Sequence, residues 1–188
     1  MTTSVPPARF SAAPPPPEPE LGPVHVLVVD DEPTLRKSLA RILAARGFAV
    51  DTADDGIVAL EMIRSRAPDV ALIDMVMPGM GGLDVLSQAK LVAPDVEIIM
   101  MTAHADVDSA VAAVRAGAYD FLTKPFASND AVALAVSKAA ERRRLVARNT
   151  RLQRELLSHE RFGEIIGTSP KMQAVYRLIE GVAAATST

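Results

Sequence analysis

The chain has 188 residues, enough for one domain with extensions. Its hydrophobic fraction of 49% is typical of a globular protein, and its net charge of −3 gives no general attraction to nucleic acid or an anionic membrane. The lack of cysteine excludes a disulfide framework, a thiol nucleophile and a thiolate metal site. Because the sequence shows neither an apolar signal core nor a membrane-spanning apolar run, we expect a cytoplasmic protein without membrane contact.

Residues 1–23 are rich in proline and have almost no apolar periodicity. Such a stretch cannot bury enough apolar surface to offset the entropy lost on ordering, so we expect a disordered leader that samples polyproline conformations. A docking peptide is the alternative interpretation of this composition.

From residue 24 onward, short apolar runs alternate with segments of helical spacing. The predicted strands cover residues 24–29, 48–53, 70–73, 96–101 and 119–122. The predicted helices cover residues from about 33 to Gly47, 55–66, 82–92, the stretch with Val107, Val111 and Val114, and a long segment from Ser128 or Asn129. This alternation predicts an α/β fold with a parallel sheet covered on both faces, in the flavodoxin-like (βα)5 doubly wound order. Ligands of such folds lie at the carboxyl ends of the strands.

Polar side chains follow four of these predicted strands. Asp30 and Asp31 follow the first, Asp74 the third, Thr102 the fourth and Lys124 the fifth. Crowded carboxylates repel one another unless a cation neutralises them, and oxygen ligands without His or Cys suit Mg²⁺. Asp30 and Asp31 would hold the ion, while Asp74 would ligate it and attack a phosphoryl group to give an acyl phosphate. The Lys124 ammonium and the Thr102 hydroxyl would stabilise the phosphoryl oxygens.

Each of these residues also has an ordinary explanation when it is taken alone. The acid pair fits an N-cap of the helix that begins near Glu32, and Asp74 before a Pro-Gly sequence fits a turn. An isolated Thr102 is typical of a capping hydroxyl, and an isolated Lys124 of a solvated charge. Their joint placement at the strand ends favours the phosphoryl-transfer site.

Residues 24–140 resemble a response-regulator receiver domain in the segments VVDDE, ALIDMVMPGMGGLDVL, IIMMTAHAD and GAYDFLTKPF. The resemblance implies that Asp74 accepts phosphate from a sensor histidine kinase. It also implies that Asp30 and Asp31 bind Mg²⁺ together with Asp74 and the backbone carbonyl of Val76.

The same resemblance assigns further roles at the fourth and fifth strands. Thr102 and Lys124 would contact the phosphoryl group, and Lys124–Pro125 would be a cis peptide that aims the lysine. Phe121 matches the aromatic switch position, where it would turn inward as Thr102 moves toward the phosphate. A plain core aromatic is the alternative for Phe121, and any switch at this position acts by packing because Phe lacks a hydroxyl.

Two further positions lie where the family tunes the access of hydrolytic water, two residues after Asp74 and Thr102. The apolar Val76 would hinder water. His104 would either order a water molecule or lie solvated in its loop.

A linker is predicted at residues 141–162, because the last receiver helix continues without Gly or Pro. Four residues follow the 4-3-4 spacing of a coiled-coil seam, namely Leu145, Asn149, Leu152 and Leu156. This pattern predicts a homodimer whose register is fixed by the asparagine, and a helix packed on its own receiver is the alternative. We interpret the arginines of this region as a solvated face rather than a nucleic-acid surface, because glutamates are interspersed with them.

Residues 163–188 resemble the opening of the AAA+ ATPase domain of NtrC-type activators, which work with sigma-54 RNA polymerase. Ser169-Pro170 predicts a helix start, followed by an apolar stripe at Met172, Val175, Ile179 and Val182. The phosphate-binding motif G-x-x-x-x-G-K-[ST] does not occur in the sequence. We therefore expect a piece of a longer protein that does not hydrolyse ATP itself, with polymerase and DNA contacts in parts outside this sequence.

Three functions fit the whole chain. The first is the regulatory module of a sigma-54-dependent transcriptional activator, in which phosphorylation rearranges a receiver–linker dimer. The second is a stand-alone receiver that relays phosphate or binds a protein. The third, a magnesium-dependent phosphatase, would want a D-x-D motif, whereas Met75 and Val76 follow Asp74. The sequence favours the first function, without enzymatic activity beyond self-promoted phosphorylation and dephosphorylation of the aspartate.

Overall fold

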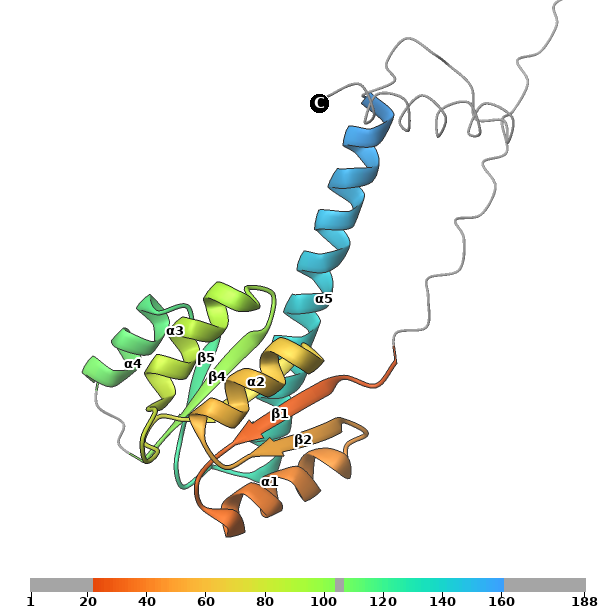
Figure 1. Cartoon of the computed structure of the whole chain (residues 1–188). Helices are drawn as coiled ribbons and strands as arrows, with labels where there is room; N and C mark the ends of the chain where they lie inside the picture. The colour runs from red at the N-terminus through yellow and green to blue at the C-terminus, as the bar shows by residue number, and fades with distance from the viewer. Residues whose placement is uncertain (1–21, 104–106, 161–188) are drawn as a thin grey trace, which may run out of the picture.

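The computed structural model describes residues 22–103 and 107–160, and the side chains of residues 104–110 and 155–160 are outside this description. The elements alternate from strand to helix along the whole described chain (Figure 1). Their bounds are β1 His25–Val29, α1 Pro33–Ala44, β2 Ala49–Ala53, α2 Gly56–Arg66, β3 Val70–Asp74, α3 Gly82–Val92, β4 Glu97–Thr102, α4 Val107–Arg115, β5 Asp120–Thr123 and α5 Asn129–Glu160.

The five strands form one parallel sheet in the order β2-β1-β3-β4-β5. This order confirms the predicted flavodoxin-like doubly wound fold. The chain reverses its direction of winding between β1 and β3, which is where such folds bind ligands. β3 and β4 each extend one residue beyond the predicted end, so that Asp74 and Thr102 are the last residues of their strands.

Two apolar layers cover the sheet, one on each face. α1 and α5 pack on one face through residues that include Leu39, Leu43 and Val136. α2 and α3 pack on the other face, where Ile63 and Leu86 are fully buried. The central strands are buried on both faces, which explains why they are continuous apolar runs rather than alternating ones.

α5 is one continuous helix with two different environments. Its first part packs on the sheet and is buried as far as Ala140. Beyond that residue it extends away from the receiver (Figure 1), and Leu145 and Leu152 are 60% and 50% exposed. Asn149 of the predicted seam is exposed as well. These exposures disagree with the alternative in which the seam packs on its own receiver.

Two of the linker arginines, which we interpreted as part of a solvated face, also form ion pairs with the receiver. Arg142 forms an ion pair with Glu97, and Arg143 forms one with Asp69. The partners lie far away in the sequence, so that the spacing of charges along the helix could not indicate them.

Several predictions fall outside the described residues. They concern most of the leader 1–23, His104, the side chain of Leu156 and the fragment 163–188. Within the part of the chain that the structure describes, no helix combines the length and the apolar character that crossing a membrane requires.

Candidate functional site

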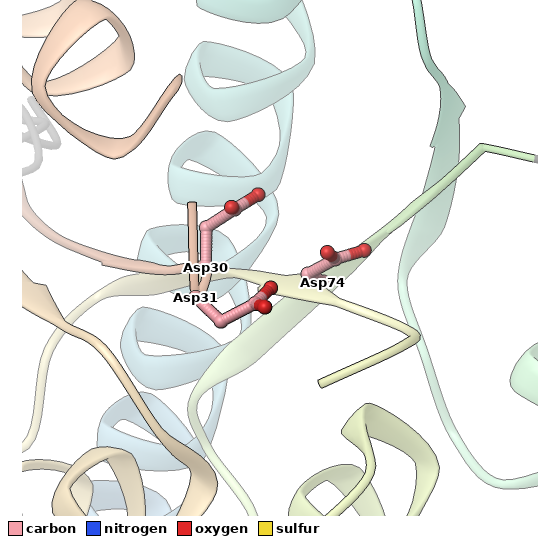
Figure 2. Close-up of side chains that lie close together, drawn as sticks. All are labelled: Asp30, Asp31 and Asp74. Atoms are coloured by element: carbon pink, nitrogen blue, oxygen red, sulfur yellow. The ribbon is translucent and has the colours of Figure 1, made fainter. Parts of the chain in front are cut away.

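Three carboxylates converge at the carboxyl edge of the sheet (Figure 2). Asp30 and Asp31 follow β1, and Asp74 ends β3, the neighbouring strand. Each offers an oxygen within 4.8 Å of the oxygens of the other two. Asp30 is fully buried and Asp74 is 8% exposed, whereas Asp31 lies open to solvent. The sheet thus brings together the three acids that the sequence predicted as metal ligands.

Two hydrogen bonds hold Asp30 in the loop before α1. The Glu32 amide donates a hydrogen bond to Asp30 Oδ1 over 2.9 Å, and the Arg36 guanidinium donates to the Asp30 carbonyl oxygen. α1 begins at Pro33 with Glu32 as its N-cap residue, and no side chain caps it. The acid pair therefore does not serve as the helix cap that its sequence position also suggested. The contact of Arg36 was not predicted from the sequence.

The turn after Asp74 brings α3 close to the end of β3. The Met75 amide donates to Met101 O over 2.8 Å, and the Gly82 amide donates to Met75 O over 3.0 Å. A Cβ atom on Gly82 would lie 2.1 Å from the backbone oxygen of Asp74, so only glycine fits this first position of α3. The glycine-rich sequence of the turn indicated a turn but not this close approach.

Lys124 bridges two of the acids. Its Nζ lies 2.7 Å from Asp30 Oδ2 and 2.9 Å from Asp74 Oδ2. The Lys124 amide also donates to Thr102 O over 2.7 Å, and the peptide Lys124–Pro125 is cis, as the resemblance implies. Burial lowers the pKa of Lys124, but the hydrogen bonds and charges of Asp30 and Asp74 outweigh burial and raise this pKa above its ordinary value. The side chain therefore carries its positive charge at neutral pH.

The remaining predicted residues differ in their exposure to solvent. Thr102 is 5% exposed at the end of β4, beside β3 on one side and β5 on the other. Phe121 is 37% exposed, which disagrees with the alternative of a plain core aromatic. It lines a shallow pocket together with Leu122 and Phe126. The side chain of Val76 points to solvent, with 73% of its surface exposed.

The donor set fits a hard divalent cation. Among the described residues, Lys124 is the cation that forms ion pairs with this group of three carboxylates, and it contacts two of them, so that acidic groups are in excess. Among the described residues the cluster consists of aspartates without His, and carboxylate oxygens are the ligands that Mg²⁺ prefers. The exposure of Asp31 leaves one side of the cluster open to water and to phosphate oxygens.

Comparison with known proteins places this site in a family. A family model described as the response regulator receiver domain matches residues 26–136. The DNA-binding transcriptional regulator NtrC of Escherichia coli K12 is 43% identical over 157 residues, which cover 82% of this chain and 32% of NtrC. The C4-dicarboxylate transport transcriptional regulatory protein DctD of Pseudomonas aeruginosa is 40% identical over 161 residues, which cover 85% of this chain and 35% of DctD.

A solved structure of a similar protein has the same fold over most of this chain. The crystal structure of NtrX from Brucella abortus, in complex with ATP, superposes with a TM-score of 0.64 at 35% identity. The superposition covers 86% of this chain and 35% of that chain. The present chain thus spans about a third of the length of each of these proteins. It belongs to the response regulator receiver domain family, as the receiver of a two-component response regulator related to NtrC and DctD.

Proposed function

We propose that Asp74 is the phosphoacceptor of the chain and that a sensor histidine kinase is its phosphoryl donor. One observation carries the proposal: Lys124 Nζ bridges Asp30 and Asp74, while Asp31 completes a three-carboxylate cluster beside them. In the reaction an Asp74 oxygen forms a bond to phosphorus while the bond from phosphorus to the imidazole nitrogen of the donor breaks. Little covalent chemistry is left to the protein, so catalysis consists of positioning and charge neutralisation.

The residues around Asp74 divide this work among them. Asp30, Asp31, Asp74 and the Val76 carbonyl would hold Mg²⁺, which when bound neutralises charge on the phosphoryl oxygens. Lys124 supplies a positive charge fixed by its contacts to two acids, and it is free to contact the phosphoryl group once Asp74 is modified. The Thr102 hydroxyl moves toward the phosphate and donates a hydrogen bond to a phosphoryl oxygen. The Phe121 ring then turns inward.

The output that we propose is control of a sigma-54-dependent transcriptional activator. The match to NtrC covers 157 residues and therefore extends beyond the receiver match of residues 26–136. This extension supports an NtrC-type regulator over a stand-alone receiver, which is the second candidate. Phosphorylation would rearrange a homodimer held by the receiver and the exposed linker helix in the cytoplasm. ATP hydrolysis and contacts to polymerase and DNA would belong to other parts of such a regulator.

Phosphorylation can be tested on the chain with acetyl phosphate as a small donor and Mg²⁺. Wild-type protein should gain the mass of one phosphoryl group in intact-protein mass spectrometry, and Asp74→Asn should gain none while it keeps its fold by circular dichroism. Asp95→Asn is the matched control, because Asp95 is an exposed aspartate that precedes β4 at the opposite edge of the sheet. Its labelling should equal that of the wild type. Labelling of Asp74→Asn would overturn the assignment.

A further inference from the structure

The linker helix is tied to the receiver by successive arginines at the amino edge of the sheet, opposite the acidic site. Arg142 pairs with Glu97 at the start of β4, and Arg143 pairs with Asp69 just before β3. Arg144 donates a hydrogen bond of 3.3 Å to the carbonyl oxygen of Gly22, which precedes β1. The arginines of one turn of α5 thus contact residues at or before the starts of three different strands.

The acceptors are themselves built into the sheet. Asp69 Oδ2 accepts a hydrogen bond of 2.8 Å from the His25 amide, and the Asp69 amide donates to His25 O over 2.8 Å. The Glu97 amide donates to Asp69 O over 3.2 Å. Asp69 therefore joins the starts of β1 and β4 and holds Arg143 with its other carboxylate oxygen. These acceptors provide fixed points rather than mobile surface charges.

The pair of Arg142 and Glu97 differs from an ordinary surface ion pair. The Glu97 side chain is only 7% exposed, and its buried Oε2 has no hydrogen-bond partner among the described residues. A buried carboxylate requires a compensating charge. Arg142 pairs with it directly through Oε1, and the Lys90 ammonium interacts with Glu97 as a second, nearby charge. The Arg142 guanidinium also lies 5.7 Å from the centre of the Tyr119 ring, just before β5. Arg142 is therefore held between the starts of β4 and β5.

These contacts lie where α5 leaves the sheet. Burial on the sheet ends at Ala140, so the helix beyond it has no apolar support from the receiver. A short helix without such support is marginally stable in water and frays. The arginines lie in the first turn after the buried segment, where they can fix both the helical state and the direction of the exposed part of α5.

We propose that Arg142 and Arg143 are positioning residues that anchor the linker helix to the sheet. They hold the exposed segment with Leu145 and Leu152 in one direction relative to the acidic site. The role rests on the proposed function, because it matters when the linker carries the response of Asp74 to a second copy of the chain. The anchor contacts β4 and β5 at their amino ends, and the site residues Thr102 and Lys124 lie at the carboxyl ends of the same strands.

The anchor can be tested by measuring a distance within one chain. The protein has no cysteine, so Ser65→Cys on α2 and Ala147→Cys on the linker, both exposed positions, provide unique sites for spin labels. Labelled chains are diluted with an excess of unlabelled chains so that the distance distribution by pulsed electron resonance reports single chains. The otherwise unchanged chain should give one narrow distribution. Arg142→Gln with Arg143→Gln should widen it at least about twofold and speed amide hydrogen exchange in residues 145–154.

Two variants separate anchoring from loss of charge. Lys138→Gln with Arg154→Gln removes two positive charges from exposed positions of the same helix and should leave the distribution narrow. Arg142→Lys with Arg143→Lys keeps the charges and should stay narrower than the glutamine variant.

The outcome decides the inference independently of phosphorylation. A narrow distribution in the glutamine variant, with the receiver folded, overturns the anchor. If that variant does not fold, the same distance is measured in Arg143→Gln alone. This single variant should fold, because the Asp69 carboxylate is partly exposed and can be solvated when its arginine is removed. The distance is measured without Mg²⁺ and without a phosphoryl donor. The anchor can therefore fail its test while Asp74 is labelled, and it can pass its test while Asp74 is not labelled.

Discussion

The two edges of the sheet use charge in opposite ways. At the carboxyl edge, three aspartates face one lysine, and the excess is negative. At the amino edge, Glu97 and Asp69 each form an ion pair with an arginine, and the Lys90 ammonium also interacts with Glu97, so that both acids are compensated by cations of the chain. A cluster with excess carboxylates needs a cation from solution, whereas acids that pair with cations of the chain need none. The comparison teaches that charge balance, rather than the number of charged residues, separates a binding site from an anchor.

Their backbones differ as well. The carboxyl edge is formed by loops after the strands, and its shape depends on the close approach of Gly82 to the end of β3. The amino edge is formed by residues at or just before the strand starts, joined by backbone hydrogen bonds such as that from Glu97 to Asp69. We expect changes at the carboxyl edge to alter binding and stability together. Changes at the amino edge should alter the linker first.

Gly82→Ala should have the largest effect on stability. The new methyl group would lie 2.1 Å from the Asp74 backbone oxygen, which cannot move without shifting the end of β3. We expect a loss of about 3 kcal/mol in the free energy of unfolding, measured by urea titration. Gly81→Ala is the matched control, since its nearest atoms lie at 3.8 Å, and should change stability by less than about 1 kcal/mol. Equal stability of the two variants would contradict the close approach of α3.

Lys124→Met should have an intermediate effect that depends on pH. Removal of the ammonium leaves Asp30 and Asp74 without their cation, and we expect a loss of about 1–2 kcal/mol at neutral pH in the absence of Mg²⁺. The folded-state pKa of Lys124 is raised, so its contribution is complete below the ordinary lysine pKa of about 10.4 and is lost as the pH rises through the raised value.

The measurement is urea unfolding of both proteins from about pH 7 to about pH 11 with a chelator present. The difference in stability should stay constant up to about pH 10 and shrink above it. Lys138→Met, at an exposed position of α5, is the control and should show almost no difference at any pH. A difference between Lys124→Met and wild type that grows with pH would reverse the assigned direction of the pKa shift.

The carboxyl edge could be predicted from the sequence, because the order of apolar runs and polar residues along the chain indicates which side chains lie at this edge. Apolar runs end at polar residues, and a parallel sheet gathers the ends of its strands at one edge. Asp30, Asp74, Thr102 and Lys124 follow such runs, so their proximity required only the strand order. The remaining differences were small, since β3, β4 and β5 each end one residue later than predicted.

The amino edge could not be predicted in the same way. Arg142 and Glu97 are 45 positions apart, and their contact depends on the path of α5 across the sheet. Charge spacing along a helix reports neighbours three and four residues away, and it therefore indicated a solvated face. Glu97 lies within the predicted strand 96–101, and its sequence position does not indicate that it is buried. The long-range pairing becomes visible only when both elements are placed in space.

Substitution of the exposed seam should have the smallest effect on the receiver. Leu145 and Leu152 are exposed, so Leu145→Ser with Leu152→Ser should change the free energy of unfolding by no more than about 0.5 kcal/mol. The dimer fraction in sedimentation equilibrium should nevertheless fall, because these leucines would fill the core of a two-stranded coil around Asn149. Removal of residues 145–160 should lower it further.

Val146→Ser is the control for the seam, because Val146 is 47% exposed but lies outside the 4-3-4 spacing. It should leave the dimer fraction unchanged, both alone and with beryllofluoride and Mg²⁺ as a mimic of the acyl phosphate. If Val146→Ser and the leucine variant lower the dimer fraction equally, the coil does not follow this register. If neither lowers it, the receiver alone holds the dimer. In that case the linker helix would contact a partner other than a second copy of the chain. The ion pairs at the amino edge would then fix the direction of the helix without contributing to self-association.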